Sequence, residues 1–205
     1  MAAYSIGAVT RSVDFFEQQF RRQAAAGDYA LNPFERAILP HLSGEVLDLG
    51  CGMGNLALAA AAAGCSVHAL DASPAAIADL SRRAGAAGGR VHAEQADLRA
   101  FQATRSYDCV VCIGLLMFFG CAQAQSVLRQ IKQAVRPGGV AAANVLIEGT
   151  TYMEMFDPSA YCLFERDALP GALPGWQPLH SAYEDFPAPG GTLKRFHTYV
   201  ARRPA

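Results

Sequence analysis

The fold is decided by the stretch Val46-Leu47-Asp48-Leu49-Gly50-Cys51-Gly52-Met53-Gly54-Asn55. It begins with an apolar run around one carboxylate, which is typical of a buried β-strand. Three glycines at alternate positions follow, and a turn built from glycine lets the backbone approach a ligand closely. The helix predicted after the turn would offer that ligand the unpaired N–H groups of its first turn. We therefore interpret the stretch as a cofactor-binding loop of the nucleotide type.

The spacing of the glycines distinguishes between two cofactors. A dinucleotide loop has the pattern G-x-G-x-x-G, which from Gly50 requires glycine at position 55, where this chain has Asn55. Asp48 at the strand end suits a ligand with an ammonium group and would repel a pyrophosphate. Cys51 is a small, polarizable residue that fits within the loop. The pattern favours S-adenosylmethionine over NAD.

Acidic residues also follow the next two predicted strands. Asp71, in Leu70-Asp71-Ala72-Ser73, is placed to accept both ribose hydroxyls, and Asp97, beside Leu98, can bond an adenine amino group. Taken alone, Asp97 is a helix N-cap more often than a ligand, and Asp71 could act as a cap through Ser73-Pro74. Together with the loop they predict one crevice at the carboxyl ends of parallel strands. The residues that we expect to contact the cofactor are Asp48, Gly50, Cys51, Gly52, Gly54, Asn55, Asp71, Ala72, Asp97, Leu98, Ile113 and Gly114.

Short apolar runs alternate with longer, alanine-rich periodic stretches from Glu45 onward, which predicts βα units on a parallel sheet. The expected strands cover residues 45–50, 66–71, 90–95, 107–113 and 139–146, and a terminal hairpin covers 177–184 and 193–202. The expected helices cover residues 12–26, 34–42, 54–63, 74–86 and 122–135. We expect a single domain with an N-terminal helical cap (1–43), a cofactor-binding core (44–147), and an aromatic insertion with the hairpin (148–205).

The composition indicates a compact chain with a small-molecule partner. Of the 205 residues, 52% are hydrophobic and 17% are charged, and the net charge is −1. Nucleic acid is not an expected partner, because binding its phosphates requires a basic stripe and none is obvious in this sequence. No apolar run is long enough to cross a bilayer, and Asp14 and Glu17 lie where a signal peptide would be apolar, so we expect a cytoplasmic protein without a membrane partner. The oligomeric state stays open.

The six cysteines, Cys51, Cys65, Cys109, Cys112, Cys121 and Cys162, are too few and too scattered for a disulfide scaffold, and we expect reduced thiols. Cys109 and Cys112 have the spacing of metal ligands. On a strand, however, residues three apart face opposite sides, so we expect no metal site.

Together these motifs resemble a class I S-adenosylmethionine-dependent methyltransferase over about residues 45–146. A closer resemblance is to the tellurite-resistance methyltransferase family. It rests on the loop, Leu70-Asp71-Ala72-Ser73, Ala76-Ile77-Ala78, Ala96-Asp97-Leu98-Arg99, Tyr107-Asp108, Leu116-Met117-Phe118-Phe119, Arg136-Pro137-Gly138-Gly139 and the C-terminal 193–202. The resemblance implies a doubly wound, Rossmann-like α/β fold with a seven-stranded, mostly parallel sheet and an antiparallel last strand. It also implies S-adenosylmethionine as cofactor.

Members of that family methylate tellurite, selenite and related soft nucleophiles. They carry a His-Arg pair before the final hairpin turn and an Arg within it, whereas this chain reads Tyr183-Glu184-Asp185-Phe186-Pro187-Ala188-Pro189-Gly190-Gly191. The oxyanion-binding set is therefore missing or relocated.

The methyl acceptor should be bound by residues after the fourth strand, by the aromatic insertion and by the cap. The candidates are Met117, Phe118, Tyr152, Tyr161, Tyr29 and Tyr4, although core packing explains each of these as well. Arg195 and His197 are two apart on a strand and therefore face the same side, so they are further candidates for the acceptor side. A solvated or hydrogen-bonded surface position explains the histidine as well. No general base is obvious, which favours an acceptor that is nucleophilic without one, such as a thiolate or selenite.

Several functions remain open at the level of sequence. The first is methyl transfer to a thiol, a selenium or tellurium oxyanion or another small metabolite, including O- or N-methylation. A methyltransferase for macromolecules would need a basic platform or an amine site after the fourth strand, and Ile113-Gly114-Leu115-Leu116 offers neither. A regulator that binds S-adenosylmethionine without turnover is the third. An NAD-linked oxidoreductase is disfavoured by Asn55 and Asp48.

Overall fold

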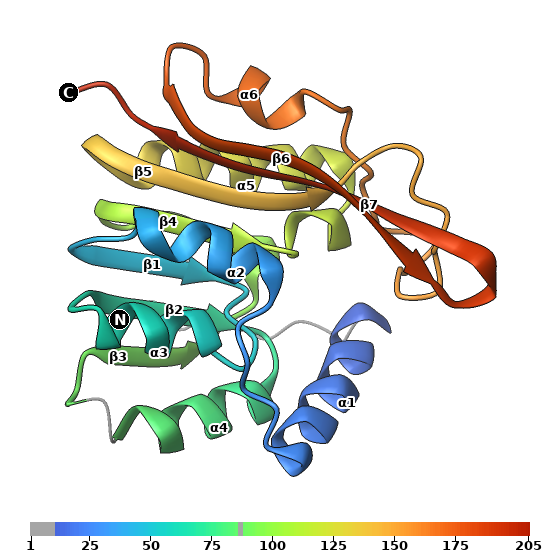
Figure 1. Ribbon diagram of the computed structural model, residues 1–205, viewed down its shortest axis with the longest axis horizontal. Coiled ribbons are helices and arrows are strands. Elements are labelled where there is room, and N and C mark those ends of the chain that lie inside the picture. The colour runs from blue at the N-terminus through green and yellow to red at the C-terminus, as the bar shows by residue number, and fades with distance from the viewer. Residues whose placement is uncertain (1–10, 86–87) are drawn as a thin grey trace.

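The computed structural model describes residues 11–85 and 88–205, which contain a seven-stranded sheet in the order β3-β2-β1-β4-β5-β7-β6 (Figure 1). The strands are β1 (Glu45–Leu49), β2 (Ser66–Asp71), β3 (Val91–Gln95), β4 (Tyr107–Ile113), β5 (Val135–Leu146), β6 (Gln177–Ala188) and β7 (Thr192–Arg202). The first five strands are parallel, and β7 runs antiparallel to both β5 and β6. The expected seven-stranded sheet with an antiparallel last strand is confirmed.

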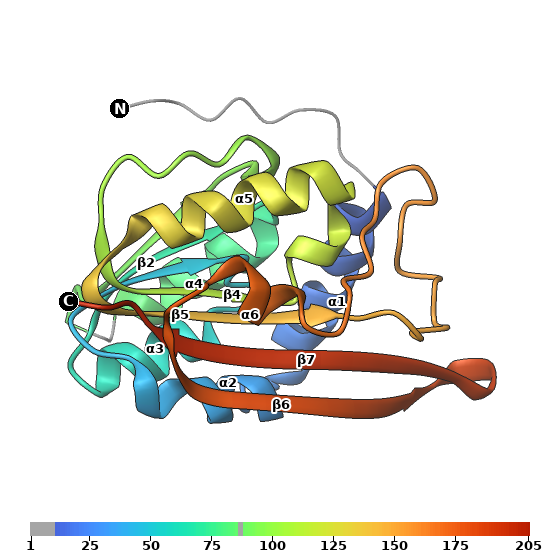
Figure 2. The same ribbon diagram turned by 90° about the horizontal axis from the view of Figure 1, so that it is seen from above.

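Helices cover both faces of the sheet (Figure 2). They are α1 (Arg11–Ala26), α2 (Pro33–Ile38), α3 (Asn55–Ala62), α4 (Pro74–Ala84), α5 (Cys121–Ala134) and α6 (Ala168–Ala172). On one face α3 and α4 pack on β2 and β3, and on the other α5 packs on β4 and β5. Successive strand residues alternate between the two faces, so Val110 belongs to the core under α5 and Val111 to the core under α3. Within the described residues, no helix is both long and apolar enough to cross a membrane.

Local sequence explains where helices begin. The Asn32 side chain accepts a hydrogen bond from the backbone N–H of Glu35, the Glu35 carboxylate accepts one from the N–H of Asn32, and Pro33 occupies the first turn of α2. Ser73 caps α4 in the same way, because its Oγ accepts a hydrogen bond from the N–H of Ala76 at 3.1 Å. These caps orient α2 and α4 beside the glycine-rich loop.

Several boundaries differ from expectation, and two of the differences have a clear cause. Helix α5 ends at Ala134, and β5 already begins at Val135 instead of residue 139, because Val135 pairs with Tyr107 before a bulge resumes the ladder at Val140. Strand β6 continues to Ala188 through Pro187, which an edge strand tolerates because one side of its backbone has no partner.

Candidate functional site

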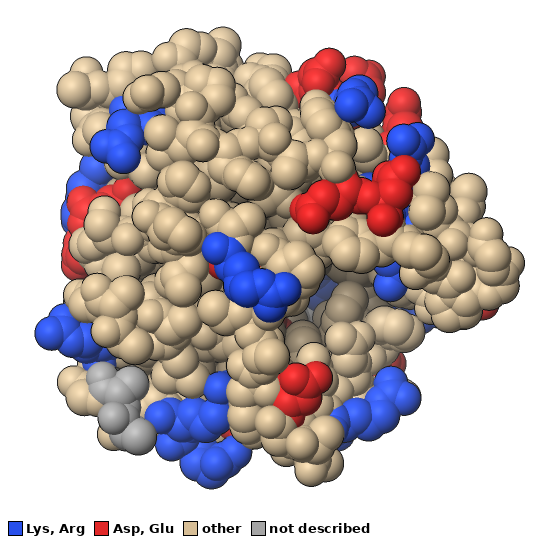
Figure 3. Space-filling model, in the orientation of Figure 1, with Lys and Arg blue, Asp and Glu red and all other residues tan. Residues whose placement is uncertain are grey.

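A cavity of about 650 Å³ lies at the carboxyl ends of the parallel strands. In the orientation of Figure 1, the surface is hollowed between α1 and the end of the β6–β7 hairpin (Figure 3). The loops after β1, β2, β3 and β4 line the cavity, together with α1 and β7. Eleven of the twelve expected cofactor contacts lie in this lining, namely Asp48, Gly50, Cys51, Gly52, Asn55, Asp71, Ala72, Asp97, Leu98, Ile113 and Gly114.

The glycine-rich loop depends on backbone conformations that other residues rarely adopt. Gly50, Gly52 and Gly54 have φ values of 73°, 51° and 68°. The N–H groups of Gly50 and Cys51 both donate to the carbonyl of Leu70, at 2.8 and 3.0 Å, which fixes the loop against β2. Gly54 is the one expected contact outside the lining. It packs against α4, where an added Cβ would lie 2.4 Å from Leu80 Cδ1.

Asp71 ends β2 and connects two of the loops. Its Oδ2 accepts a hydrogen bond from the N–H of Gly52 at 2.8 Å, and its Oδ1 accepts one from the N–H of Ser73 at 2.8 Å. Burial raises the pKa of Asp71 despite these hydrogen bonds. Each carboxylate oxygen has a further lone pair, so the group can also accept hydrogen bonds from ligand hydroxyls.

Asp48 is the most perturbed carboxyl group in the lining. It is only 4% exposed, and burial, with the nearby carboxylates of Glu35 and Asp71, raises its pKa to about 8. A buried carboxylate of this kind is stabilised by a cation placed beside it. The Asp48 carboxyl group therefore fits a ligand with an ammonium group, such as the amino-acid part of S-adenosylmethionine.

Asp97 and Leu98 follow β3 as expected. The Asp97 Oδ1 caps the 3-10 turn η3 (Leu98–Ala100) by accepting from the N–H of Arg99 at 3.0 Å, and both carboxylate oxygens accept from the Arg99 guanidinium. Leu98 is buried at the lining. Asp97 thus has a capping role and a place in the cavity wall, and the Leu98 side chain offers an apolar surface for a flat ring.

Helix α1 lies across the open side of the cavity. Its Glu17 carboxylate accepts hydrogen bonds from the Ser73 hydroxyl and from the N–H of Ala75, the latter at 3.3 Å. Phe20 lies over the glycine-rich loop, because a Cβ added to Gly52 would lie 3.1 Å from the Phe20 ring. The Glu17 carboxylate and the Phe20 ring are therefore two of the contacts that hold the cap to the loops of the core.

The wall opposite the glycine-rich loop is mostly apolar. Met117 and Phe118, expected on the acceptor side, lie in the lining, and Phe16 of α1 packs edge-to-face on Phe118 with 4.9 Å between ring centroids. Three further lining side chains, Phe34, Leu146 and Phe196, were not singled out from the sequence. Phe34 and Phe196 stack at 4.7 Å and bring α2 against β7.

Two polar residues that sequence reasoning missed also line the cavity. Asn144 of β5 is fully buried. Its Nδ2 donates to Thr198 Oγ1 at 2.9 Å, and its Oδ1 has no hydrogen-bond partner among the described residues. Lys194 of β7 lies 4.6 Å above the Tyr152 ring, and burial lowers its pKa. The signal for Asn144 was available, since it is one amide in the apolar run Val140–Leu146. Lys194 had no such signal, because its strand carries several polar residues.

Arg195 and His197 share one face of β7 as expected, but that face is opposite the cavity. The lining contains Lys194 and Phe196 instead, because successive residues of a strand point to opposite sides. The Arg195 Nε donates to Asp185 at 3.0 Å. His197 is fully buried, stacks on Tyr183 at 4.2 Å and lies 3.1 Å from Ser181 Oγ. The expectation that Arg195 and His197 would lie on the acceptor side is therefore corrected.

The expected tyrosines also lie outside the lining. Tyr152 is buried under Lys194, and Tyr161 is exposed with its ring 5.3 Å from that of Phe156. Both rings pack within the aromatic insertion. Tyr4 falls outside the described residues.

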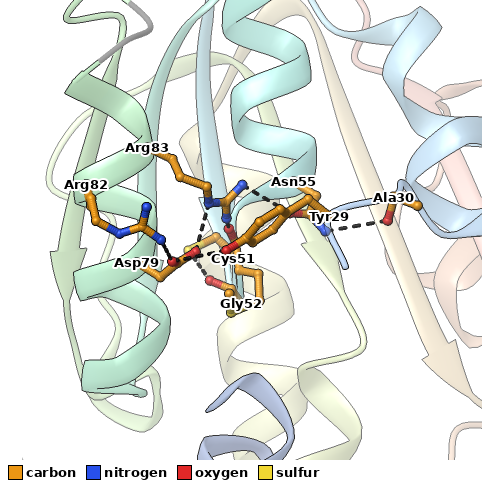
Figure 4. Close-up of polar contacts among 9 residues, drawn as sticks. Tyr29, Ala30, Cys51, Gly52, Asn55, Asp79, Arg82 and Arg83 are labelled. Carbon is orange, nitrogen blue, oxygen red and sulfur yellow. Dashed lines mark hydrogen bonds and ion pairs between the residues drawn. The ribbon is translucent and has the colours of Figure 1, made fainter. Parts of the chain in front are cut away.

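Tyr29 belongs to a polar cluster behind the glycine-rich loop (Figure 4). The Arg83 guanidinium lies 4.1 Å from the centre of the Tyr29 ring, donates to the carbonyl of Met53, and donates to Asp79 Oδ2 at 2.8 Å. Asn55 Nδ2 donates to the carbonyl of Ala30 at 3.5 Å. Asp79 is only 8% exposed, so its carboxyl group is a buried member of this cluster. The cluster ties the cap and α4 to the loop.

Two of the cysteines are not reduced thiols. Cys121, at the start of α5, and Cys162, in the aromatic insertion, form a disulfide, whereas Cys51, Cys65, Cys109 and Cys112 are free and buried. Cys121 and Cys162 are 41 residues apart in the sequence, so the pairing was not expected. The aromatic insertion returns to the start of α5, where the N–H of Cys162 donates to the carbonyl of Met117.

Comparisons with known proteins agree with this geometry. Residues 46–139 match the family described as methyltransferase domain. The ubiquinone biosynthesis O-methyltransferase of Rickettsia akari is 33% identical over 107 residues, which cover 52% of this chain and 42% of that protein. The chain spans less than two thirds of the length of such curated relatives.

Solved structures share the fold. TehB from Haemophilus influenzae superposes with a TM-score of 0.73 at 20% identity, covering 94% of this chain and 67% of that one. The N-methyltransferase NodS from Bradyrhizobium japonicum, in complex with S-adenosyl-L-homocysteine, has a TM-score of 0.67 at 17% identity. The superposition covers 93% of this chain and 99% of NodS. The segment that carries the glycine-rich loop and the strand-end carboxylates thus resembles methyltransferase domains in sequence, and the chain shares the fold of solved methyltransferases.

Proposed function

We propose that this protein transfers a methyl group from S-adenosylmethionine to a small-molecule nucleophile held in the same cavity. The observation that carries the proposal is the buried Asp48 carboxyl group, which shares the cavity with the strand-end carboxylates Asp71 and Asp97. Asp48 would hold the ammonium group, Asp71 the ribose hydroxyls, and Asp97 with Leu98 the adenine.

The cofactor supplies an electrophilic methyl group whose carbon bonds to the nucleophile, while the sulfur keeps the bonding electron pair and leaves as S-adenosylhomocysteine. The contribution of the chain is positioning and exclusion of water. Aligning the reactants can supply about 7–11 kcal/mol of the barrier. The Phe16–Phe118 contact and the Glu17–Ser73 hydrogen bond hold α1 over the cavity, so its open side is covered by apolar rings.

The acceptor class follows from the wall. Phe34, Phe118 and Phe196 favour an acceptor with an apolar part, and the Lys194 ammonium attracts an anionic group. A thiolate or a selenium or tellurium oxyanion needs no general base. A hydroxyl group of a small metabolite is the second candidate, which the O-methyltransferases among the relatives support.

The test is release of S-adenosylhomocysteine from purified protein with S-adenosylmethionine and a panel of selenite, tellurite, thiols, phenols, amines and carboxylates. Turnover on selenite, tellurite or thiols supports the first candidate, and turnover confined to phenols or carboxylates supports the second. Calorimetric binding of S-adenosylmethionine without turnover on any acceptor would overturn the catalytic proposal in favour of a regulator. An Asp71→Ala variant serves as the control for cofactor-dependent signal.

A further inference from the structure

One face of β2 and β3, away from the cavity, carries three potential metal ligands. His68 of β2 is the register partner of His92 of β3, and Glu94 lies two residues further along β3 on the same face. Helix α5 covers this side of β4 and β5 (Figure 2). Between β3 and β4 the chain forms only the η3 turn and coil, so it supplies no α-helix to cover the same side of β2 and β3. The side chains of His92 and Glu94 are therefore accessible, at 75% and 41% exposure.

The distances among the three groups suit a small tetrahedral ion. His68 Nε2 lies 3.3 Å and His92 Nε2 lies 3.9 Å from the same oxygen, Glu94 Oε2. The ligand atoms of all three residues lie within 4.8 Å of one another. Bonds of about 2.0–2.1 Å to a tetrahedral Zn²⁺ separate neighbouring ligand atoms by about 3.3–3.4 Å. One pair already has this spacing, and the exposed His92 side chain would have to move closer to complete it.

The surroundings of His68 match those of a metal-bound imidazole. Its Nδ1 lies 2.9 Å from the Tyr107 hydroxyl, and that hydroxyl also accepts a hydrogen bond from Arg105 Nε at 3.0 Å. A histidine that binds through Nε2 donates its Nδ1–H to such an oxygen, which orients the ring.

We propose that His68, His92 and Glu94 bind one divalent transition-metal ion, with Zn²⁺ as the best fit for two imidazoles and one carboxylate. The fourth position is open to water. The ion would join the edge strand β3 to β2, and these are the strands that lead to Asp97 and Asp71. The site was not expected from the sequence, because only the cysteine spacing suggested ligands and the two histidines are separated by a whole helix.

The test is titration of the untagged protein with Zn²⁺ by calorimetry. We expect one saturable site per chain and a higher melting temperature with Zn²⁺. The exposed substitutions His92→Ala and Glu94→Gln should each weaken binding at least tenfold. His180→Ala is the matched control, because His180 pairs with His41 at 6.5 Å between ring centroids with neither residue belonging to a metal-binding cluster among the described residues.

Absence of saturable binding, or equal affinity in His92→Ala, Glu94→Gln and the parent, would overturn the proposal. Tyr107→Phe keeps the buried ring and removes only the hydroxyl, so it tests the orientation of His68. We expect affinity about tenfold lower in that variant, in the range found for groups that orient a metal ligand. Unchanged affinity would eliminate Tyr107 as a positioning residue.

Discussion

The Asp71 carboxylate, at the end of β2, accepts a hydrogen bond at 2.8 Å from the N–H of Gly52 in the loop after β1. It also accepts one from the N–H of Ser73, the residue that caps α4 and donates to Glu17 of the cap. One side chain therefore connects the glycine-rich loop, α4 and α1 around the cavity. A change at Asp71 should reach both the ligand and the loop that holds it.

Replacing Asp71 with Ala should weaken S-adenosylmethionine binding by about 1.5–3 kcal/mol, the range for hydrogen bonds to a charged group. This corresponds to about 10- to 150-fold in the dissociation constant. Calorimetry measures the change, with Asp185→Ala as a control, since Asp185 pairs with Arg195 on the opposite face of the hairpin. Unchanged affinity in Asp71→Ala would remove Asp71 from the site.

The pH dependence of stability should report on Asp48. Its pKa is about 8 in the folded protein against 3.8 for an ordinary aspartate, so between these pH values the folded state keeps a proton that the unfolded state has lost. Stability must then fall as the pH rises through this window. The melting temperature of Asp48→Asn should therefore rise relative to that of the parent as the pH increases from about 4 to 8. A constant difference between the two across this range contradicts the assignment.

Reduction should destabilise the protein. The Cys121–Cys162 disulfide closes a long loop between α5 and the aromatic insertion, and such a bond contributes about 2–4 kcal/mol to the free energy of unfolding. Thermal unfolding with and without dithiothreitol measures the loss. The Cys121→Ser/Cys162→Ser double variant should melt like the reduced parent and should not respond to the reductant. An equal response in the double variant would assign the effect to another thiol.

Gly54→Ala should cost more stability than the same change at Gly27. Both glycines have positive φ, 68° and 64°, so both variants lose about 1–2 kcal/mol from backbone conformation. At Gly54 the new Cβ also meets Leu80 at 2.4 Å, whereas at Gly27 no atom of the described residues lies within 4 Å. Overpacking adds about 1–3 kcal/mol at Gly54, which urea unfolding can resolve. Equal losses of unfolding free energy in the two variants would mean that α3 and α4 can move apart to accommodate the new Cβ without losing stability.

Lys194→Met should lower kcat/KM for an anionic acceptor at least about tenfold while leaving the affinity for S-adenosylmethionine unchanged, because one charged hydrogen bond exceeds about 1.4 kcal/mol. Arg195→Met is the matched control, since the next residue of β7 lies on the face away from the cavity. This prediction rests on the proposed function. An equal loss in both variants would indicate damage to the hairpin instead of a lost contact.

Local sequence accounts for most elements of the fold. Alternating apolar runs and capped periodic stretches depend on near neighbours, so α2 could be predicted from Asn32, Pro33 and Glu35, and the glycine-rich loop from its spacing. The carboxylates at the strand ends were equally accessible, because parallel strands bring their carboxyl ends to one edge of a sheet. The boundary between α5 and β5 differs from the expected one, because the pairing of Val135 with Tyr107 that sets it is a long-range contact.

The sequence by itself thus indicated a Rossmann-like α/β fold, its glycine-rich loop, and eleven of the twelve expected cofactor contacts that line the cavity. Only the tertiary structure decided which face of β7 lines the cavity, that Cys121 reaches Cys162, and that His68 lies beside His92 and Glu94. The physical reason is distance along the chain. Spacing within a segment sets side-chain direction relative to that segment, but the partner that each face meets depends on how distant segments pack.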